Sequence, residues 1–395
     1  MSVTVQNSAL FENTSAAFSH QSNQELKKAY RLFRSFSNPL LLPVGKALIQ
    51  IAFNLNAPIE GLFKKTIYHQ FCGGESLHDC KRVIHRLADN NISTALQYSV
   101  ETKATEEEYN RTMQELLDAI YYSESNPHVK VVCCKLTGIG SFNIFEKLHG
   151  GTALSGSEEV AFENIRRRME TICSVAEKAS VAIFFDAEES WIQRPMDQLI
   201  DEMMLRYNKQ QAVVYNTFQL YRNDRLDFLK ASFEKARANK FILGAKLVRG
   251  AYMEKERKRA RNKNLPSPIH QDKQAVDKAY NEALEFCAAN FEGIAFCAAT
   301  HNEQSCLRLV NLIDSKGIDR NHPNIFFSQL YGMGEHLTYN LAKEGFNATK
   351  LVPYGPVREA IPYLIRRAEE NSSVAGQVGR ELQLLKKEMK RRGLM

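Results

Sequence analysis

The spacing of apolar residues changes near residue 92. From residue 24 to about 90, apolar side chains recur at helical spacing, beginning with the stripe Leu26, Tyr30 and Phe33. Beyond residue 92, short apolar or β-branched runs alternate with longer helical patterns. This change predicts a helical N-terminal region, residues 1–90, followed by a domain in which strands and helices alternate.

Two further helices are expected in the N-terminal region, over Leu40–Leu55 and over Leu77–Leu87 after the break at Gly73 and Gly74. The first is the longest apolar stretch of the chain, but polar residues interrupt it, and it is shorter than the roughly 20 residues that a membrane-spanning helix needs. We interpret it as a helix packed on the protein, with a membrane contact as the alternative.

Eight short runs predict strands. They cover Ile92–Val100, Val129–Leu136, Val181–Phe185, Ala212–Tyr215, Ile242–Val248, Ile294–Ala298, Ile325–Phe327 and Lys350–Pro353. Strands that alternate with helices form right-handed βαβ units and a parallel sheet, and eight such units fit an α/β fold of the distorted (β/α)8 TIM-type barrel class over residues 91–372. A doubly wound sheet stays the alternative, although only a lone G-x-G, at Gly138 and Gly140, follows a strand.

Composition narrows the class of protein. The chain is 44% hydrophobic and 25% charged, and Lys plus Arg exceed Asp plus Glu by 52 to 45, which is typical of a globular protein without a nucleic-acid partner. The eight cysteines form no C-x-x-C pair and no histidine has metal-ligand spacing, so we expect reduced thiols and no metal. The first 25 residues contain no Lys or Arg, which argues against an export signal and predicts a cytoplasmic protein.

Polar residues close each predicted strand, where the active site of a barrel lies. In chain order they are Glu101, Lys135, Asp186, Asn216 with Gln219, Lys246 with Arg249, Thr300 with His301 and Asn302, Gln329 and Tyr354. A single polar residue of this kind is best interpreted as a strand end exposed to solvent, but eight in succession indicate a functional site. Lys135 and Lys246 carry most weight, because their apolar neighbours imply desolvation unless an anionic partner is present.

A second group of polar residues lies on the last helix of the barrel. If Pro362 stands in its first turn, Tyr363, Arg366, Arg367 and Glu370 share one side. Two cations in early turns oppose the helix dipole, and a ligand carboxylate or phosphate would resolve that conflict. The alternative is a solvated face with Arg367 paired to Glu370.

Six motifs in order resemble the proline dehydrogenase family over roughly residues 92–375. They are Tyr98–Glu101 (YSVE), Asp186–Glu189 (DAEE), Lys246–Tyr252 (KLVRGAY), Ala299–Asn302 (ATHN), Tyr331–Gly334 (YGMG) and Tyr363–Asn371 (YLIRRAEEN). The resemblance implies a barrel that holds FAD at its carboxyl-terminal face and oxidises L-proline to Δ1-pyrroline-5-carboxylate. It also implies that the electrons pass to a membrane quinone.

The resemblance assigns roles residue by residue. Arg366, Arg367 and Lys135 would hold the proline carboxylate, Asp186 and Tyr354 would order the pocket, and Glu101 would be a gate that pairs with Arg366. Leu330 and Tyr363 would complete the substrate site, and Lys135, Asp186, Lys246 and Tyr354 are the expected catalytic group. The expected cofactor residues are Ala187, Asn216, Gln219, Lys246, Arg249, Gly250, Ala251, Thr300, His301, Asn302, Gln329 and Glu370.

Two features refine the resemblance. Many bacterial family members have Arg where this chain has Lys246, and both side chains can donate a hydrogen bond to flavin N5. Tyr354 favours proline as the substrate, because hydroxyproline-oxidising relatives have a smaller residue there. The length of 395 residues also predicts an enzyme without the aldehyde dehydrogenase module that some family members carry.

Three alternatives stay open. A hydroxyproline dehydrogenase is the neighbour within the family. A Schiff-base aldolase on the same barrel would use a strand-end lysine such as Lys135 or Lys246. A non-enzymatic basic scaffold would need only the arginine and lysine runs, of which residues 254–261 are best interpreted as a solvated helix.

Residues 373–395 form the third predicted region, a basic amphipathic helix. Val378, Leu382, Leu385 and Met389 repeat at helical spacing, and six basic residues surround them: Arg380, Lys386, Lys387, Lys390, Arg391 and Arg392. Such a helix can lie on an anionic membrane or cap the barrel with its basic side in solvent. The first possibility predicts a peripheral contact on the inner face of a membrane.

Overall fold

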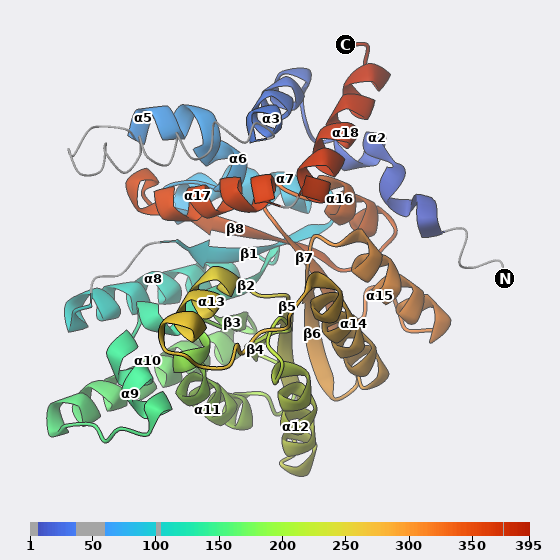
Figure 1. The fold of residues 1–395 in the computed structure, drawn as a ribbon. Helices are drawn as coiled ribbons and strands as arrows, with labels where there is room; N and C mark the ends of the chain where they lie inside the picture. The colour runs from blue at the N-terminus through green and yellow to red at the C-terminus, as the bar shows by residue number, and fades with distance from the viewer. Residues whose placement is uncertain (1–6, 37–59, 100–103, 374) are drawn as a thin grey trace. The chain divides into compact units, whose positions relative to one another are not determined.

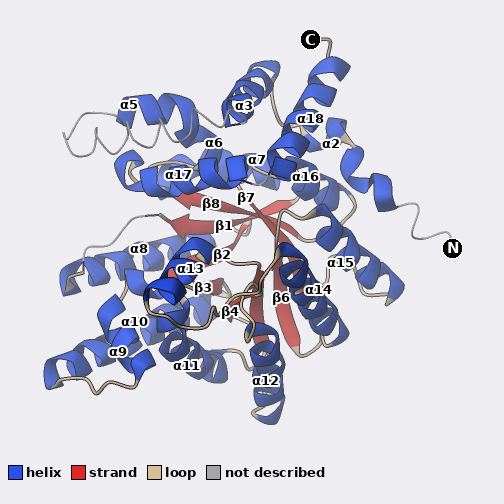
Figure 2. Ribbon diagram, viewed as in Figure 1, coloured by secondary structure: helices blue, strands red, loops and turns tan. Residues whose placement is uncertain are grey.

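Eight parallel strands form a closed barrel in sequence order (Figure 1, Figure 2). The computed structural model describes residues 7–36, 60–99, 104–373 and 375–395. The strands are β1 Ile92–Tyr98, β2 Val129–Lys135, β3 Ala182–Asp186, β4 Val214–Gln219, β5 Leu243–Val248, β6 Ile294–Ala299, β7 Ile325–Leu330 and β8 Ala348–Tyr354. The (β/α)8 prediction is confirmed, and the doubly wound alternative is excluded.

Two strands, β4 and β7, extend by more than one residue beyond their predicted carboxyl ends. β4 continues through Asn216 to Gln219, and β7 continues through Gln329 to Leu330. The sequence suggested earlier ends because polar residues interrupt the apolar runs. In the structure these polar side chains are buried and hydrogen-bonded, so the ladder continues past them.

The chain forms two compact units, and their boundaries differ from those predicted at residues 90 and 372. Residues 101–328 form one unit, here called the central unit, and residues 1–100 with 329–395 form the other, here called the terminal unit. The division follows from chain connectivity, because β1 pairs in parallel with β8 along its whole length, from Ile92 opposite Ala348 to Tyr98 opposite Tyr354.

The central unit alternates strands with helices from β2 to β7. Its helices are α8 Glu106–Glu124, α9 Phe142–Gly150, α10 Gly156–Ala179, α11 Ser190–Tyr207, α12 Arg225–Ala238, α13 Met253–Asn262, α14 Lys273–Ala289 and α15 Glu303–Ser315, and a 3-10 turn covers Leu136–Gly138. Aromatic rings fill its interior, where Phe184 lies 4.8 Å from Tyr215 and stacks on Phe326 at 5.8 Å between centroids. These rings are a packed base below the polar strand ends.

The terminal unit places helices around β1 and β8. They are α2 Thr14–Ala17, α3 Asn23–Phe36, α5 Glu60–Phe63, α6 His69–Phe71, α7 Leu77–Ala88, α16 Glu335–Lys343, α17 Val357–Ser373 and α18 Ala375–Arg391, with a 3-10 turn at Asn7–Glu12 and a π-helical turn at Lys64–Tyr68. The predicted helix at Leu77–Leu87 is confirmed, and a capping box formed by Ser76 and Asp79 fixes its start. The predicted helix over Leu40–Leu55 lies outside the described residues.

Helix α17 begins earlier than predicted. It starts at Val357, so Pro362 lies inside the helix rather than in its first turn. Tyr363 and Arg367 therefore belong to the middle turns, where the helix dipole exerts little force on a charge. The predicted conflict between two cations and the N-terminal dipole is wrong for this reason.

The apolar side of α18 is covered by the protein. Leu384, Leu385 and Met389 are buried in a cluster with residues of α3 and α17, and the helix packs on α3 and α2 (Figure 1). Arg380 and Lys387 pair with Glu12, the last residue of the 3-10 turn at Asn7–Glu12. The helix is amphipathic, but its apolar side is not free to enter a membrane, which contradicts that part of the prediction.

Two general features complete the fold. All eight cysteines are free and buried, and burial raises the pKa of thiols such as Cys287 above its ordinary value. Among the described residues, no helix has the length and apolar character needed to cross a membrane.

Candidate active site

A buried ion pair stands at the carboxyl ends of two strands of the central unit. The Nζ atom of Lys246 on β5 lies 2.6 Å from Oδ1 of Asp186, the last residue of β3. Burial alone would lower the pKa of the Lys246 ammonium, but the carboxylate of Asp186 raises it above its ordinary value. The lysine therefore carries its charge at all physiological pH values.

Lys135 ends β2 and lies in register with Asp186 on β3. Its side chain is exposed, so the desolvation expected from its apolar neighbours does not occur, and Cys133 and Cys134 are buried instead. Two residues past Asp186, Glu188 is buried and accepts hydrogen bonds from the backbone and hydroxyl of Thr137. Burial raises the pKa of Glu188, while the charge of Lys135 and the bonds from Thr137 lower it.

Asn216 is held in the interior by a carboxylate from the helix layer. Its Nδ2 donates to Oδ1 of Asp197 at 3.0 Å, and Asp197 also pairs with Arg225 at 2.7 Å. The Asn216 Oδ1 atom is buried and has no hydrogen-bond partner among the described residues. A buried amide oxygen of this kind needs a donor, which a ligand can provide.

Gln219 links two loops at the carboxyl ends of the strands. Its Nε2 donates to the carbonyl of Glu188 at 2.7 Å, and its Oε1 accepts from the backbone N–H of Ala251 at 3.1 Å. Ala187 and Gly250 belong to the same two loops. Gly250 has φ +141°, and a Cβ there would fall 2.2 Å from the ring of Tyr221, so only glycine allows this approach.

Arg249 follows β5 and is fixed by three hydrogen bonds. Its guanidinium donates to Asp277 at 2.7 Å, to Thr300 at 2.7 Å and to Ser305 at 2.9 Å. It also lies 4.3 Å from the centre of the Tyr280 ring. These contacts fix the direction of the remaining N–H groups and make them suitable for an anion.

The predicted residues after β6 lie at the start of α15. Asn302 is its N-cap and accepts a hydrogen bond from the N–H of Ser305 at 2.9 Å, while His301 stands between Asn302 and Thr300. Thr300 joins this helix start to Arg249. A helix N-terminus beside an arginine favours a phosphate group.

The donors of the central unit fit a flavin dinucleotide. The ammonium of Lys246 and the unpartnered Oδ1 of Asn216 provide one donor and one acceptor for the edge of a polar ring system. Arg249 and the start of α15 provide cationic and backbone donors for a pyrophosphate.

The terminal unit holds the predicted residues of β7 and β8. Tyr354 ends β8, is 2% exposed and lies 5.4 Å from the ring of Tyr98. Gln329 is buried and accepts a hydrogen bond from Thr338 at 2.7 Å. Leu330, the last residue of β7, is partly buried against the apolar cluster of this unit.

The two arginines of α17 differ in their exposure to solvent. Arg367 is buried, and its guanidinium carbon lies 5.1 Å from the centre of the Tyr363 ring, whereas Arg366 is exposed. This cation–π contact presents a planar guanidinium on an aromatic base. Glu101 and the side chain of Glu370 lie outside the described residues.

The sequence did not single out two acidic residues of the central unit. Glu188 is part of the quoted DAEE motif and could have been recognised as the second acidic residue after Asp186. Asp197 lies inside α11, and its partners come from β4 and α12, so no local pattern identifies it.

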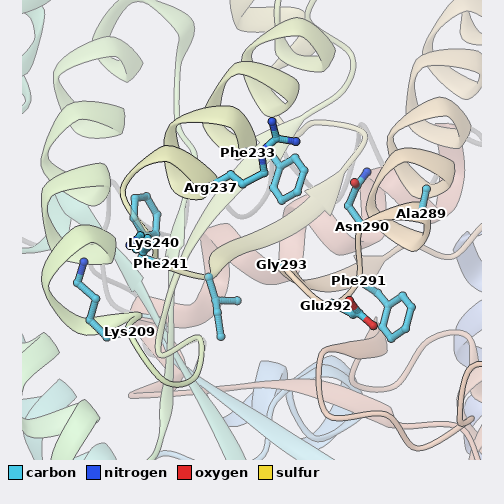
Figure 3. A pocket seen from close by; sticks show the side chains of 11 residues that line it. Lys209, Phe233, Arg237, Lys240, Phe241, Ala289, Asn290, Phe291, Glu292 and Gly293 are labelled. Carbon is cyan, nitrogen blue, oxygen red and sulfur yellow. The ribbon is translucent and has the colours of Figure 1, made fainter.

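A cavity of about 640 Å³ lies away from all the predicted residues (Figure 3). Residues that precede β5 and β6, including Lys240, Phe241 and Gly293, line it at the amino-terminal ends of these strands. Barrel enzymes carry their chemistry at the opposite ends of the strands. We therefore assign no part of the reaction to this cavity.

Known proteins resemble this chain in sequence and fold. Residues 80–380 match the family described as Proline dehydrogenase. Carbapenem antibiotics biosynthesis protein CarD of Pectobacterium carotovorum subsp. carotovorum is 34% identical, over 82% of this chain and 83% of its own length. Proline dehydrogenase 1, mitochondrial, of Dictyostelium discoideum is 29% identical (98% and 76%), and hydroxyproline dehydrogenase of Xenopus laevis is 28% identical (97% and 90%).

A solved structure supports the fold. Proline utilization A from Bdellovibrio bacteriovorus, inactivated by N-propargylglycine, superposes with a TM-score of 0.76 at 17% identity, over 96% of this chain and 42% of that one. This likeness shows the barrel, and the match to the family over residues 80–380 shows the relationship. The chain belongs to the proline dehydrogenase family.

Proposed function

We propose that this enzyme uses FAD to oxidise L-proline to Δ1-pyrroline-5-carboxylate. The buried pair of Lys246 and Asp186 carries the proposal, because the lysine holds a fixed charge at the strand ends of a chain of this family. A bound flavin would supply the hydride acceptor. In this proposal Lys246 donates a hydrogen bond to the flavin ring, and Arg249 with the start of α15 holds the pyrophosphate.

The remaining family assignments concern the substrate. Arg366, Arg367 and Lys135 bind its carboxylate, and Tyr354, Tyr363 and Leu330 pack against its ring. Charge-assisted bonds from arginine supply the affinity, and the apolar surfaces exclude water from the imine product. The observation that supports this part is the guanidinium of Arg367, which is buried on the ring of Tyr363.

The flavin proposal predicts a colour change. The purified protein, reconstituted with FAD, should show a flavin absorbance band that bleaches on addition of L-proline under anaerobic conditions. A protein that stays colourless after reconstitution, and that borohydride traps with a carbonyl substrate, would instead support the Schiff-base aldolase. A colourless protein without such trapping would support the third alternative, the non-enzymatic basic scaffold.

The carboxylate proposal predicts different effects for the two arginines. Arg367→Met should weaken a proline-like carboxylate inhibitor by about 10- to 100-fold, because a hydrogen bond to a charged group contributes about 1.5–3 kcal/mol. Arg366→Met should have a smaller effect, since Arg366 is exposed. Flavin-perturbation titration measures both. Equal affinity in Arg367→Met and the unmodified enzyme would assign Arg367 to structure alone.

Hydroxyproline oxidation is the second candidate function, and the Xenopus laevis relative is the observation that favours it. Against it, the phenol of Tyr354 is packed on Tyr98 and leaves little room for an added hydroxyl. We expect higher kcat/KM for L-proline than for 4-hydroxyproline, and Tyr354→Ser should narrow the difference. If hydroxyproline is the better substrate of the unmodified enzyme, the assignment reverses.

A membrane quinone is the proposed electron acceptor, reached by a peripheral contact. The segment 257–265 at the end of α13 supports this, because it contains five cations and no acidic residue. Lys258, Arg261 and Lys263 are exposed and Leu265 is 52% exposed, whereas Arg257 and Arg259 pair with Glu254 and Glu146. Each cation near an anionic membrane contributes about 1 kcal/mol. Changing Lys258 and Lys263 together to Glu should abolish sedimentation with anionic vesicles. The same exchange at Lys386 and Lys390 of α18 is the matched control, and equal loss in both would contradict a contact through α13.

A further inference from the structure

Gly73 and Gly74, which follow α6 closely, pair with the end of β8 through an isolated parallel bridge. Within β8, the carbonyl of Leu351 accepts a hydrogen bond from the N–H of Tyr331, the residue that follows β7. Two residues later on the same edge, the carbonyl of Pro353 accepts the N–H of Gly73 at 2.8 Å. Gly73 therefore continues the hydrogen-bonding of β8 where β7 has ended.

The backbone of Tyr354 has a neighbour on each edge of β8, Gly74 on one and Ser99 on the other. Gly74 forms a parallel bridge with Tyr354, and the N–H of Gly355 donates to the carbonyl of Gly74 at 3.1 Å. On the other edge of β8, the N–H of Ser99 donates to the carbonyl of Tyr354 at 2.9 Å. The backbone of Tyr354 is thus fixed along both edges.

Both positions need glycine, Gly73 because of β8 and Gly74 because of the start of α7. A Cβ at Gly73 would lie 2.5 Å from Cγ1 of Val352, and a Cβ at Gly74 would lie 2.3 Å from Cβ of Asp79. The Gly73–Gly74 break that the sequence showed between two helices is therefore a contact with β8.

One hydroxyl group completes the contact. The Oη atom of Tyr68, at the end of the π-helical turn, lies 2.6 Å from the carbonyl oxygen of Gly74 and 2.7 Å from that of Gly355. Tyr68 is fully buried, and burial raises the pKa of its phenol, so the group stays a donor. Without this hydroxyl, the carbonyls of Gly74 and Gly355 lose their side-chain donor.

The segment from Tyr68 to Gly74 also fixes the turn after Leu330. Nε2 of Gln70 donates to the carbonyl of Gly332 at 2.9 Å. Gly332 has φ +78°, and a Cβ there would fall 1.8 Å from the carbonyl oxygen of Gln70. Both proposed substrate residues of β7 and β8 are thus followed by backbone that this segment holds.

We propose that Tyr68 is a positioning residue for substrate discrimination, acting through Tyr354. The inference rests on the proposed function, because it concerns the role given there to Tyr354. The Tyr68 hydroxyl holds Gly74 and Gly355 together and so keeps the phenol of Tyr354 at one distance from the substrate ring. When the hydroxyl is lost, the end of β8 relaxes and the pocket accepts the additional hydroxyl of 4-hydroxyproline more readily.

The test compares Tyr68→Phe, Tyr354→Ser and the double variant in the flavin-loaded full chain. The measured quantity is the ratio of kcat/KM for L-proline to that for 4-hydroxyproline, which is independent of flavin content. Tyr68→Phe should lower this ratio about 3- to 10-fold, the range of one lost hydrogen bond. In the Tyr354→Ser background it should change the ratio less than twofold. Tyr109→Phe, at a buried tyrosine of α8, is the control and should leave the ratio unchanged.

The outcomes separate this inference from the proposed function. If Tyr354→Ser lowers the ratio and Tyr68→Phe does not, the positioning role is overturned. An equal effect of Tyr68→Phe in both backgrounds overturns it as well, because the action then bypasses Tyr354. An unchanged ratio in Tyr354→Ser instead overturns the role of Tyr354 itself. If Tyr68→Phe does not fold, Tyr68→His, whose shorter side chain cannot reach both carbonyls, replaces it; a lowered ratio supports the inference and an unchanged ratio overturns it.

Discussion

Lys246 and Lys350 are both buried lysines on barrel strands, yet their surroundings differ. Lys350 on β8 is inaccessible to solvent and directs its ammonium at the carbonyls of Leu330 and Met333 and at Glu335, 3.4 Å away. Lys246 on β5 has Asp186 as its single hydrogen-bond partner among the described residues. An ammonium has three donors, so Lys350 is saturated by the protein and Lys246 retains donors for a ligand.

The pKa values of the two lysines shift in opposite directions. Burial lowers the pKa of Lys350, and the charges of Glu335 and Glu381 only partly restore it. For Lys246, the carboxylate of Asp186 outweighs burial and raises the pKa. Burial of a lysine is therefore no sign of function by itself, and the number of protein acceptors separates a structural lysine from one that retains donors for a ligand.

The largest expected effect is the loss of stability in Lys350→Met. Removing one partner of a buried ion pair leaves the other uncompensated, so the free energy of unfolding should fall by about 3–5 kcal/mol. Urea unfolding followed by far-ultraviolet circular dichroism measures it. Lys135→Met, at an exposed strand end, is the control and should change stability by less than about 0.5 kcal/mol. Equal stability of Lys350→Met and the control would remove the structural role of Lys350.

Lys246→Met should lose activity rather than stability. Removing one preorganised donor costs about 10²- to 10³-fold in turnover, so kcat/KM for L-proline should fall by that factor. Stability should fall less than in Lys350→Met, because the side chain of Asp186 is 13% exposed and can be hydrated when the lysine is absent. Dye-linked proline oxidation and urea unfolding of the same preparations check both parts. A variant with full activity would make Lys246 a second structural lysine.

Sequence patterns predicted the barrel because its signals are local. Apolar runs at eight places and helical periods between them predicted the strands. The largest differences at the carboxyl ends occurred where buried polar residues such as Asn216 and Gln329 lie within the strand. The proposed site residues of the central unit were chosen from a related local signal, since each lies near the carboxyl end of a strand or in the loop that follows it.

Features that depend on distant partners could not be predicted. Lys350 looked like the first residue of a predicted strand, and its acceptors Leu330, Met333 and Glu335 come from another loop. The sequence left open whether α18 lies on a membrane or on the protein, because the residues of α3 that cover its apolar side are more than 300 positions away. Nothing near Tyr68 in sequence indicated that its hydroxyl would reach Gly355.

Replacing each lysine with arginine should cause smaller losses of activity and stability than replacing it with methionine. Lys246→Arg should keep kcat/KM within about tenfold, because guanidinium also donates hydrogen bonds and the site leaves room for a ligand. Lys350→Arg should lower stability by about 1–3 kcal/mol, because the larger group does not fit a fully enclosed position. The same assays apply. Similar stability losses at both positions would show that size, rather than free donors, separates the two lysines.

The smallest expected effect concerns His20, which stacks on Tyr339 at 3.9 Å and lies 3.7 Å from the carboxylate that also faces Lys350. Burial, and then the charges of Arg86, Lys350 and Arg392, lower the pKa of His20 from 6.5 to about 2. In the unfolded chain this histidine takes up a proton below pH 6.5, whereas in the folded protein it stays neutral. Stability should therefore fall as the pH drops below 6.5.

For one proton the fall is at most about 1.4 kcal/mol per pH unit. Urea unfolding at pH 7.0 and at pH 5.5 should show this loss in the unmodified enzyme and a smaller loss in His20→Gln, which cannot be protonated. The difference between the two proteins isolates the histidine from other groups that titrate in this range. If both lose the same stability, the pKa of His20 does not differ between the folded and unfolded protein, and the lowering by burial and by Arg86, Lys350 and Arg392 is contradicted.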